Sequence, residues 1–394
     1  MAACLLTRGK SVIRNVPGLR DVQTMSNVLT NLGARVTLDE GTAVIDTSGI
    51  DNFEAPYELV RTMRASYYVL GPLVAVMKNA RVSLPGGCTI GARPVNLHLE
   101  GLEKLGAVVD IAHGYIEAKA ENLRGSEIDL CGKKGSSVGA TINTMMAASL
   151  ASGTTVIEGA AMEPEVQDVA GFIRVMGGDI EGDGTPVITI RGQNELGPAD
   201  YLVIPDRIEA GTFGVAAAMT GGEVRVTGCL PLHLKSTLDT LSRIGVGIDI
   251  HSDSFLIRSE GAGQLCSLSV EASQYPGFPT DMQAQIMALA TLIPGESLVK
   301  ESIFENRFLH AVELSRMGAD IVLDGPVARI TGVETLTGAP VMASDLRASA
   351  ALVIAGLAAE GETRVYRIYH LDRGYETLEK KLRGLGADCE RVSE

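Results

Sequence analysis

The sequence repeats one short phrase six times along its 394 residues. Each copy holds an apolar residue, a glycine and then a short, partly apolar run, as in Leu32-Gly33-Ala34-Arg35-Val36. The six glycines, which lie 73, 71, 68, 73 and 68 residues apart by subtraction, are Gly33, Gly106, Gly177, Gly245, Gly318 and Gly386. A glycine at a helix end can take the left-handed conformation, so each phrase predicts the end of an amphipathic helix followed by a strand. Six units of about 70 residues follow from this spacing.

Two further elements precede that helix in the repeat. Segments typical of strands are 11–13, 81–84, 155–157, 223–226, 297–299 and 363–366. Small apolar helices are predicted before four of these segments, over 138–150, 208–219, 282–292 and 346–359. No single unit can bury its apolar helix faces alone, so the units should stack in groups. We therefore expect an α/β fold in two domains of three units each, residues 1–204 and 205–394.

The first unit is shorter than the others. In units two to six the first helix is expected to begin 36 to 45 residues before the glycine, whereas only 32 residues precede Gly33. We therefore expect residues 1–6 to be the remainder of a helix, and the chain to be shortened at its N-terminus.

Charge and cysteine usage argue against several classes of function. A net charge of −14 disfavours a binder of nucleic acids or anionic membranes, because such proteins neutralise phosphates with excess Lys and Arg. No run of ~18 apolar residues and no signal-peptide pattern is present, which predicts a soluble protein without membrane insertion. The cysteines occur singly and no histidine pair has ligand spacing, so we expect a cytoplasmic protein without disulfides or a metal site. Dinucleotide-binding and P-loop patterns are absent, which disfavours a nicotinamide or ATP enzyme.

One glycine-rich loop holds a candidate site. Residues 84–94 contain two prolines, the thiol of Cys88 and the guanidinium of Arg93, and His98 follows shortly after. Such a hinged loop could bring a nucleophile or acid and an anion clamp to the same ligand. The alternative from these residues alone is a plain connection with a small buried cysteine.

Charged residues open several of the small apolar helices. Acids at a helix start, such as Asp206, Asp281 and Asp345, could be simple caps. Arginines there oppose the helix dipole, so Arg61 and Arg64, expected one turn apart on one helix face, favour an anionic ligand. Further arginines fall in turn-like stretches at 305–308 and 369–375. If these loops surround one cleft, six units contribute to one charged site.

Five motifs in order carry a family resemblance. They are Pro85-Gly86-Gly87-Cys88 with Gly91-Ala92-Arg93-Pro94, Phe278-Pro279-Thr280-Asp281-Met282-Gln283-Ala284-Gln285, Glu305-Asn306-Arg307-Phe308, Asp345-Leu346-Arg347-Ala348-Ser349 and Tyr369-His370-Leu371-Asp372-Arg373-Gly374-Tyr375. From Leu5 to its end the chain resembles the enolpyruvyl transferases of the UDP-N-acetylglucosamine 1-carboxyvinyltransferase (MurA) family. The resemblance implies a two-lobed inside-out α/β barrel with three units per lobe and the substrate between the lobes.

The same resemblance implies a reaction without metal or organic cofactor. The enolpyruvyl group of phosphoenolpyruvate would move to the 3′-hydroxyl of UDP-N-acetylglucosamine with release of phosphate, the first committed step of peptidoglycan precursor synthesis. It also implies inactivation by fosfomycin at Cys88. Both substrates are small molecules, and the oligomeric state is left open.

Site roles are assigned by matching positions. Cys88 would be the acid or transient covalent partner, Asp281 the base on the sugar hydroxyl, and Asp345 a residue that arranges charges. Phosphoenolpyruvate would be clamped by Arg93 and Arg373 with Arg64 close by. The nucleotide would be contacted by Arg93, Pro94, Leu97 and His98, and the sugar by the main chain of Ile303. Arg307 would hold the two lobes in their closed state, and Arg347 is a further expected substrate contact.

Two departures from the family pattern leave alternatives open. The chain begins after the family's Lys-Asn turn, and Gly135 stands where some relatives have a lysine near the diphosphate. The alternatives are 3-phosphoshikimate 1-carboxyvinyltransferase, a non-catalytic UDP-sugar-binding relative with a regulatory role, and a structural six-unit ring such as a DNA clamp. The lid-like loop with His98 argues against the shikimate enzyme. The retained Cys88, Asp281 and Arg373 argue against a non-catalytic relative, and the acidic net charge argues against a DNA clamp.

Overall fold

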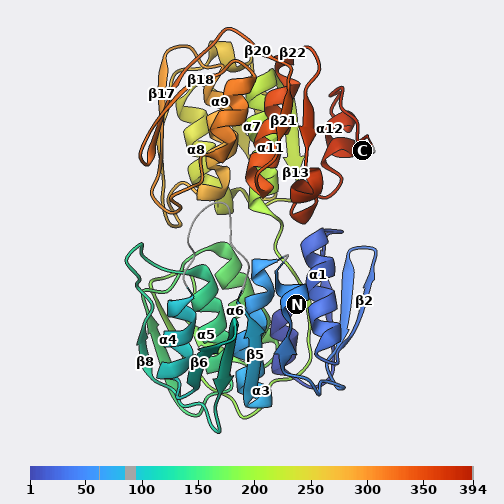
Figure 1. Cartoon of the computed structure of the whole chain (residues 1–394), viewed down its shortest axis with the longest axis vertical. Coiled ribbons are helices and arrows are strands. Elements are labelled where there is room, and N and C mark those ends of the chain that lie inside the picture. Colours follow the sequence, from blue (N-terminus) through green and yellow to red (C-terminus); the bar gives the residue numbers. More distant parts are fainter. Residues whose placement is uncertain (62, 85–94, 393–394) are drawn as a thin grey trace. The chain divides into compact units, whose positions relative to one another are not determined.

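The computed structural model describes residues 1–61, 63–84 and 95–392. Contacts divide these residues into two compact units, one reaching to Ile204 and the other beginning at Pro205 (Figure 1). Each unit has an apolar core of its own, with Leu29, Ile116 and Met145 in the first and Phe255 and Ile286 in the second.

The six repeated glycines all end helices, as predicted. Their φ angles lie between +95° and +106°, the left-handed region that glycine adopts without a steric penalty. In each case the residue after the glycine donates its N–H to a carbonyl five residues earlier, as Ala34 does to Leu29 (3.0 Å). The helices that end there are α1 (Arg20–Asn31), α4 (Asn96–Lys104), α6 (Pro164–Val175), α8 (Lys235–Arg243), α10 (Leu309–Arg316) and α12 (Leu378–Gly384).

A strand follows the glycine in five of the six units. These strands are β2 (Arg35–Asp39), β6 (Val108–Ala112), β10 (Asp179–Glu181), β14 (Gly247–Ile250) and β18 (Asp320–Asp324). Each pairs antiparallel with a return strand that comes next in the chain. The prediction was wrong after Gly386, because residues 387–392 form no strand and no return strand follows them in the described part of the chain.

Three four-stranded sheets form the outside of the first unit. Their strand orders are β12-β1-β3-β2, β4-β5-β7-β6 and β10-β11-β9-β8. The strands not yet bounded are β1 (Lys10–Arg14), β3 (Thr42–Asp46), β4 (Glu54–Ala55), β5 (Asn79–Ser83), β7 (Tyr115–Lys119), β8 (Glu127–Asp129), β9 (Thr154–Glu158), β11 (Val187–Arg191) and β12 (Asp200–Leu202). β12 is parallel to β1, with Val12 opposite Asp200, so the last strand of the unit completes the sheet of its first strand.

Buried helices form the inside of this unit. α5 (Val138–Ala148) is buried from Ala140 onward and packs against α3 (Leu70–Met77), which also contacts η1 (Ala2–Leu6). The expected helix remainder at residues 1–6 is therefore a 3-10 helix rather than an α-helix.

The helix expected to start at Arg61 is interrupted. A four-residue helix, α2 (Tyr57–Val60), ends before Arg61, and Arg64 opens the 3-10 helix η2 (Arg64–Val69). The two arginines therefore do not share one helix face, contrary to the prediction. Pro72 lies in the first turn of α3, where its missing N–H is tolerated, and this favours a helix that begins near Leu70 rather than at Arg61.

The second unit repeats this arrangement of helices and sheets. Its sheets have the orders β13-β15-β14, β16-β17-β19-β18, β20-β22 and β21-β23. Their new strands are β13 (Gly222–Thr227), β15 (Ser254–Ser259), β16 (Ser269–Ala272), β17 (Glu296–Glu301), β19 (Val327–Thr331), β20 (Leu336–Thr337), β21 (Pro340–Met342), β22 (Ala359–Glu360) and β23 (Arg364–Tyr366).

Three mutually contacting helices form its interior, namely α7 (Arg207–Thr220), α9 (Gln283–Ala290) and α11 (Leu346–Leu357). All eight residues of α9 are buried. Many residues of α7 and α11 are small, which allows the backbones of these helices to approach closely. The predicted inside-out α/β architecture is confirmed, since each unit has apolar helices inside and sheets outside (Figure 1).

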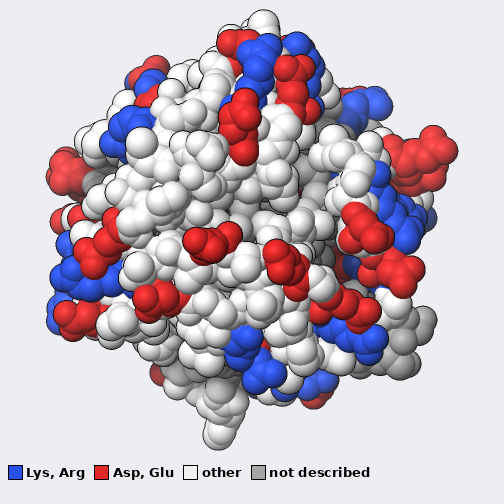
Figure 2. Space-filling model, turned by 90° about the horizontal axis from the view of Figure 1, so that it is seen from above, with Lys and Arg blue, Asp and Glu red and all other residues white. Residues whose placement is uncertain are grey.

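The surface carries charges of both signs. On the face of the second unit seen in Figure 2, acidic and basic side chains lie close to one another around uncharged areas. Ion pairs such as Arg258 with Asp249 (2.6 Å) link neighbouring strands of this unit. No helix within the described ranges is long and apolar enough to cross a membrane.

Candidate active site

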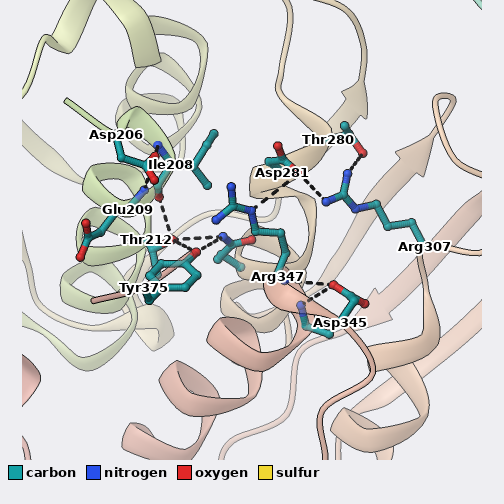
Figure 3. Close-up of polar contacts among 12 residues, drawn as sticks. Asp206, Ile208, Glu209, Thr212, Thr280, Asp281, Arg307, Asp345, Arg347 and Tyr375 are labelled. Carbon is teal, nitrogen blue, oxygen red and sulfur yellow. Dashed lines mark hydrogen bonds and ion pairs between the residues drawn. The ribbon is translucent and has the colours of Figure 1, made fainter. Parts of the chain in front are cut away.

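Asp281 lies in η5 (Thr280–Met282), directly before the buried helix α9. Its Oδ1 atom accepts a hydrogen bond of 2.5 Å from Nη2 of Arg307 and lies 3.7 Å from Nε of Arg347 (Figure 3). The two arginine side chains are only 5% and 12% exposed, whereas the side chain of Asp281 is 42% exposed. A carboxylate held by two nearly buried cations thus remains accessible to a ligand.

The electrostatics of this cluster keep Asp281 ionised. Desolvation alone would raise the pKa of its carboxyl group, but the charges of Arg307 and Arg347, the hydrogen bond from Arg307 and the charge of Arg207 together lower that pKa well below its ordinary value. At neutral pH Asp281 is therefore a carboxylate that can only accept hydrogen bonds.

Arg307 lies in the turn between β17 and α10 and binds two neighbouring residues. Its Nη1 atom donates to Oγ1 of Thr280 (2.8 Å), while Nη2 binds Asp281. Thr280 donates to Oε2 of Glu301 (2.6 Å), and Oε1 of Glu301 accepts the N–H of Ile303 (2.7 Å). This series of hydrogen bonds fixes Arg307, the η5 turn and the main chain at Ile303 relative to one another.

Arg347 lies at the start of α11, beside the residue that caps this helix. Oδ1 of Asp345 accepts the N–H groups of Arg347 and Ala348, both at 3.0 Å, so Asp345 is a helix cap, one of the two interpretations open from sequence. The guanidinium of Arg347 lies over the ring of Tyr375, 5.5 Å from its centre. Its Nε and Nη1 atoms have no hydrogen-bond partner among the described residues. Unpaired donors on a buried cation favour an anionic ligand.

Tyr375 connects this cluster to two core helices. Its hydroxyl group lies 2.9 Å from Oγ1 of Thr212 on α7 and 3.3 Å from Nε2 of Gln285 on α9 (Figure 3). The ring is almost fully buried, at 1% exposure. Arg373 comes two residues earlier, at the end of η6 (Ile368–Arg373), and is half-buried. Tyr375 therefore anchors the segment that carries Arg373 to the interior of the second unit.

Asp206 at the start of α7 is also a cap. Its Oδ1 atom accepts the N–H groups of Ile208 (2.7 Å) and Glu209 (3.1 Å). The neighbouring Arg207 is buried, lies 5.7 Å from the ring centre of Tyr275, and adds positive charge near Asp281.

A second group of predicted residues lies in the first unit. Leu97 and His98 occupy the first turn of α4, and Arg64 opens η2 with its guanidinium 5.7 Å from the ring centre of Tyr67. The ring of His98 lies 5.9 Å from that of Tyr67, and its Nδ1 atom is 3.0 Å from Nδ2 of Asn143. Burial, aided by the charge of Arg64, lowers the pKa of His98 to about 4.

Three predicted site residues, Cys88, Arg93 and Pro94, lie outside the described residues. At Gly135, the position at which some relatives have a lysine, φ is +87°, a conformation that strains any residue with a side chain. Lys133 and Lys134 beside it are exposed. Within the described part of the chain, no group of three or more His, Cys, Asp or Glu could hold a metal ion.

Comparisons with known proteins show the family to which the chain belongs. The pattern of the family described as EPSP synthase (3-phosphoshikimate 1-carboxyvinyltransferase) matches residues 1–382. A UDP-N-acetylglucosamine 1-carboxyvinyltransferase of Geotalea uraniireducens is 53% identical over 390 residues, which cover 99% of this chain and 92% of that protein. The chain belongs to the EPSP synthase family. The predicted family resemblance is confirmed.

Other similar proteins extend the comparison. UDP-N-acetylglucosamine 1-carboxyvinyltransferase 2 of Carboxydothermus hydrogenoformans is 53% identical over 396 residues, covering all of this chain and 93% of that protein. The crystal structure of the enolpyruvyl transferase NikO from Streptomyces tendae is 27% identical with a TM-score of 0.87, covering 98% of this chain and 91% of NikO. EPSP synthase from Acinetobacter baumannii, 16% identical with a TM-score of 0.71 over 98% of this chain and 93% of that chain, shows the fold alone.

Several residues of the cluster had not been predicted from sequence. Glu301, Thr212 and Tyr375 were missed as positioning groups, although Tyr375 lies inside one of the recognised motifs. Glu301 ends β17 directly before the turn with Arg307, the position at which the repeat places its site loops. This position within the repeat was the one sequence signal that could have identified Glu301. Nothing in the pattern of α7 distinguishes Thr212 from the small residues around it.

Proposed function

We propose that this chain transfers the enolpyruvyl group of phosphoenolpyruvate to the 3′-hydroxyl of UDP-N-acetylglucosamine and releases phosphate. The observation that carries the proposal is an identity of 53% over nearly the whole chain to proteins named UDP-N-acetylglucosamine 1-carboxyvinyltransferase. The product would be a peptidoglycan precursor, so the reaction would serve cell-wall biogenesis in the cytoplasm. The chemistry needs no metal or organic cofactor.

The reaction requires an acid, a base and cations. A proton added to C3 of phosphoenolpyruvate creates positive charge at C2, and the sugar hydroxyl oxygen then bonds to C2 while losing its proton. Loss of a C3 proton and cleavage of the C2–O bond to phosphate restore the double bond. Each proton needs a positioned donor or acceptor, and the phosphate and carboxylate need donors that remain in place as charge develops.

Asp281 is proposed as the base for the sugar hydroxyl. It is ionised, partly exposed and fixed by Arg307, so it can accept a hydrogen bond from that hydroxyl without first losing a proton of its own. Its low pKa makes it a weak base, and the proton would therefore pass to it together with formation of the C–O bond, when the hydroxyl becomes strongly acidic.

The arginines are proposed to bind the anionic groups. The Nε and Nη1 atoms of Arg347 have no hydrogen-bond partner among the described residues, although Nε lies 3.7 Å from Asp281. The segment that carries Arg373 is anchored to α7 and α9 through Tyr375. Arg93, Cys88 and Pro94 would complete the site from the glycine-rich loop, with Cys88 as acid or transient covalent partner. Asp345 would act indirectly, by capping the helix that carries Arg347.

The nucleotide sugar is proposed to contact the residues assigned to it by the family resemblance. Leu97, His98 and Arg64 would contact it from the first unit, together with Arg93 and Pro94. From the second unit, the main chain of Ile303 would contact the sugar. Glu301 supports this role, because it holds the N–H of Ile303 and so fixes the local backbone.

Phosphate release from phosphoenolpyruvate, measured with and without UDP-N-acetylglucosamine, tests the proposal. We expect release only when the nucleotide sugar is present. Asp281→Asn should lower the rate by about 10³-fold, whereas Asp324→Asn, an exposed control on β18, should not change it. Release with shikimate 3-phosphate instead would favour the sister enzyme, and binding of the nucleotide sugar without any release would favour a non-catalytic relative.

A further inference from the structure

We propose that Asn143 fixes His98 as a neutral imidazole whose proton is on Nε2, which makes His98 a hydrogen-bond donor to an oxygen atom of the bound nucleotide sugar. Asn143 would thus be a positioning residue that acts through His98. The ligand in this inference rests on the proposed function, whereas the protonation state of His98 rests on the structure of the first unit alone.

The orientation of the Asn143 amide is set by two backbone groups. Asn143 is fully buried on α5, and its Oδ1 atom accepts the N–H of Gly71 at 3.0 Å. Its Nδ2 atom donates to the carbonyl oxygen of Tyr67 at 3.1 Å. A backbone N–H can only donate and a carbonyl can only accept, so the opposite amide orientation would break both hydrogen bonds. The nitrogen of the amide therefore faces Tyr67 and His98.

That orientation decides the tautomer of His98. One hydrogen of Nδ2 serves Tyr67, and the second points to Nδ1 of His98, 3.0 Å away. Nδ1 must then be the acceptor, and the proton of the neutral ring must be on Nε2. In a charged imidazolium Nδ1 would also carry a hydrogen, which would face the N–H of Asn143. The nearby guanidinium of Arg64 disfavours a positive charge on the ring as well.

The Nε2 atom lies against the start of α5. A Cβ atom added to Gly139, the second residue of that helix, would come within 2.9 Å of Nε2 and 2.8 Å of Cε1, so only glycine leaves room for the ring. No described residue accepts a hydrogen bond from Nε2, and His98 keeps 9% of its surface exposed. A donor without a protein partner at the edge of a core is suited to a ligand acceptor.

The chemistry of that acceptor follows from the tautomer. An Nε2–H group selects an oxygen with a lone pair, such as a phosphate or carbonyl oxygen, and rejects an N–H group at the same position. First-turn amides of α5 face the same end of the helix, where Ser137 caps the N–H of Ala140 at 3.3 Å. They favour a negatively charged or strongly polar oxygen there. Both features match the pyrophosphate and uracil oxygens of a UDP-sugar.

Nitrogen-15 NMR of the unmodified, histidine-labelled chain tests the tautomer directly. We expect His98, assigned by its loss in His98→Gln, to show an unprotonated Nδ1 and a protonated Nε2 at neutral pH and at pH 5.5. A protonated Nδ1 in either condition would overturn the inference. The nitrogen shifts are those of the unmodified chain, with His98→Gln used only for assignment, so the result does not depend on the identity of the ligand.

Binding and turnover measurements test the role of Asn143. Asn143→Leu should weaken UDP-N-acetylglucosamine binding about tenfold, the typical effect of one hydrogen bond, with little change in kcat at saturating nucleotide sugar. His98→Gln, whose amide can place an N–H near Nε2, should bind more tightly than His98→Leu. Asn27→Leu, on an exposed face of α1, is the matched control.

The outcomes separate this inference from the proposed function. If the unmodified chain binds and turns over UDP-N-acetylglucosamine but Asn143→Leu and His98→Leu bind it equally well, the inference fails and the function stands. If the unmodified chain neither binds nor turns over the nucleotide sugar, the proposed function and the assigned ligand both fail, while the NMR result still decides the tautomer.

Discussion

Three acids at helix starts have different roles, and only their contacts distinguish them. Asp206 and Asp345 accept the N–H groups of the helices that follow them. Asp281 instead points its carboxylate at Arg307 and Arg347. Sequence pattern alone left the cap interpretation open for all three, because a cap needs only the acid and the helix, whereas the ion pairs depend on residues about 26 and 66 positions later.

The ionisation of Asp281 should depend on Arg307. Arg307→Gln removes the charge and part of the hydrogen bonding that lower the pKa of Asp281, so that pKa should rise. The acid limb of the pH profile of kcat/KM should therefore move to higher pH, with a rate loss of about 10²–10³ at neutral pH. Arg307→Lys keeps the charge but cannot bind Thr280 and Asp281 together. Its rate and its acid limb should therefore lie between those of the unmodified chain and those of Arg307→Gln.

Arg329→Gln, an exposed arginine paired with Glu296, serves as the control for this experiment. An unchanged acid limb in Arg307→Gln would show that Asp281 does not govern it.

At the scale of elements, the repeat allowed most helices and strands to be predicted. A glycine with positive φ ends a helix wherever the phrase occurs, and this local rule requires no knowledge of the rest of the fold. The predictions failed where a distant partner decides the structure. Residues 387–392 have no return strand beside them, and the segment before α3 is divided into two short helices around Arg61 and Arg64.

The anchoring of η6 by Tyr375 should affect the phosphoenolpyruvate site. Tyr375→Phe removes the hydroxyl bound to Thr212 and Gln285, which still bind each other at 3.1 Å, so the free energy of unfolding should fall by only about 1 kcal/mol. Because Arg373 is carried by the same segment, the KM for phosphoenolpyruvate should rise roughly three- to tenfold. The upper value corresponds to the loss of one hydrogen bond. Steady-state kinetics and urea unfolding measure the two effects.

Affinity for UDP-N-acetylglucosamine should stay unchanged in Tyr375→Phe, since the altered contacts, with Thr212 and Gln285, involve no residue proposed to bind the nucleotide sugar. Tyr366→Phe, with a partly exposed ring on β23, is the matched control. A normal KM for phosphoenolpyruvate in Tyr375→Phe would mean that the hydroxyl does not position Arg373.

The contact between α3 and α5 requires a glycine. A Cβ atom at Gly71 would lie 2.3 Å from the backbone oxygen of Asn143, which cannot move without shifting α5. Gly71→Ala should therefore destabilise the first unit by about 1–3 kcal/mol, as overpacking of a helix contact does. Gly384→Ala in α12 has open space around the added Cβ, and it should be neutral or stabilising by up to about 1 kcal/mol. Equal melting temperatures for the two variants would contradict this account.

At the scale of the whole molecule, each unit buries one histidine in a neutral form. Burial lowers the pKa of both His98 and His310 to about 4; Asp345 opposes the shift at His310, while Arg307 adds to it. Since the folded chain binds fewer protons than the unfolded chain between pH 4 and pH 6.5, its stability should fall as the pH decreases through this window. The loss per histidine should be on the order of 2–3 kcal/mol at the acidic end.

Urea unfolding at pH 7 and pH 4.5 measures this loss. His310→Gln should reduce the pH dependence of the second unit, and His251→Gln, on the surface, should leave it unchanged. A stability that is equal at the two pH values would show that neither histidine is buried in its neutral form.

The pairing of β12 with β1 has a consequence for how the chain is made. β1 leaves the ribosome early, but its parallel neighbour at Asp200 appears 188 residues after Val12. At a synthesis rate of about 5–20 residues per second, the nascent chain would wait roughly 10–40 s for its edge to be covered. During that interval one side of β1 exposes unpaired backbone groups to other growing chains. The first unit is therefore most vulnerable to aggregation before translation reaches its boundary.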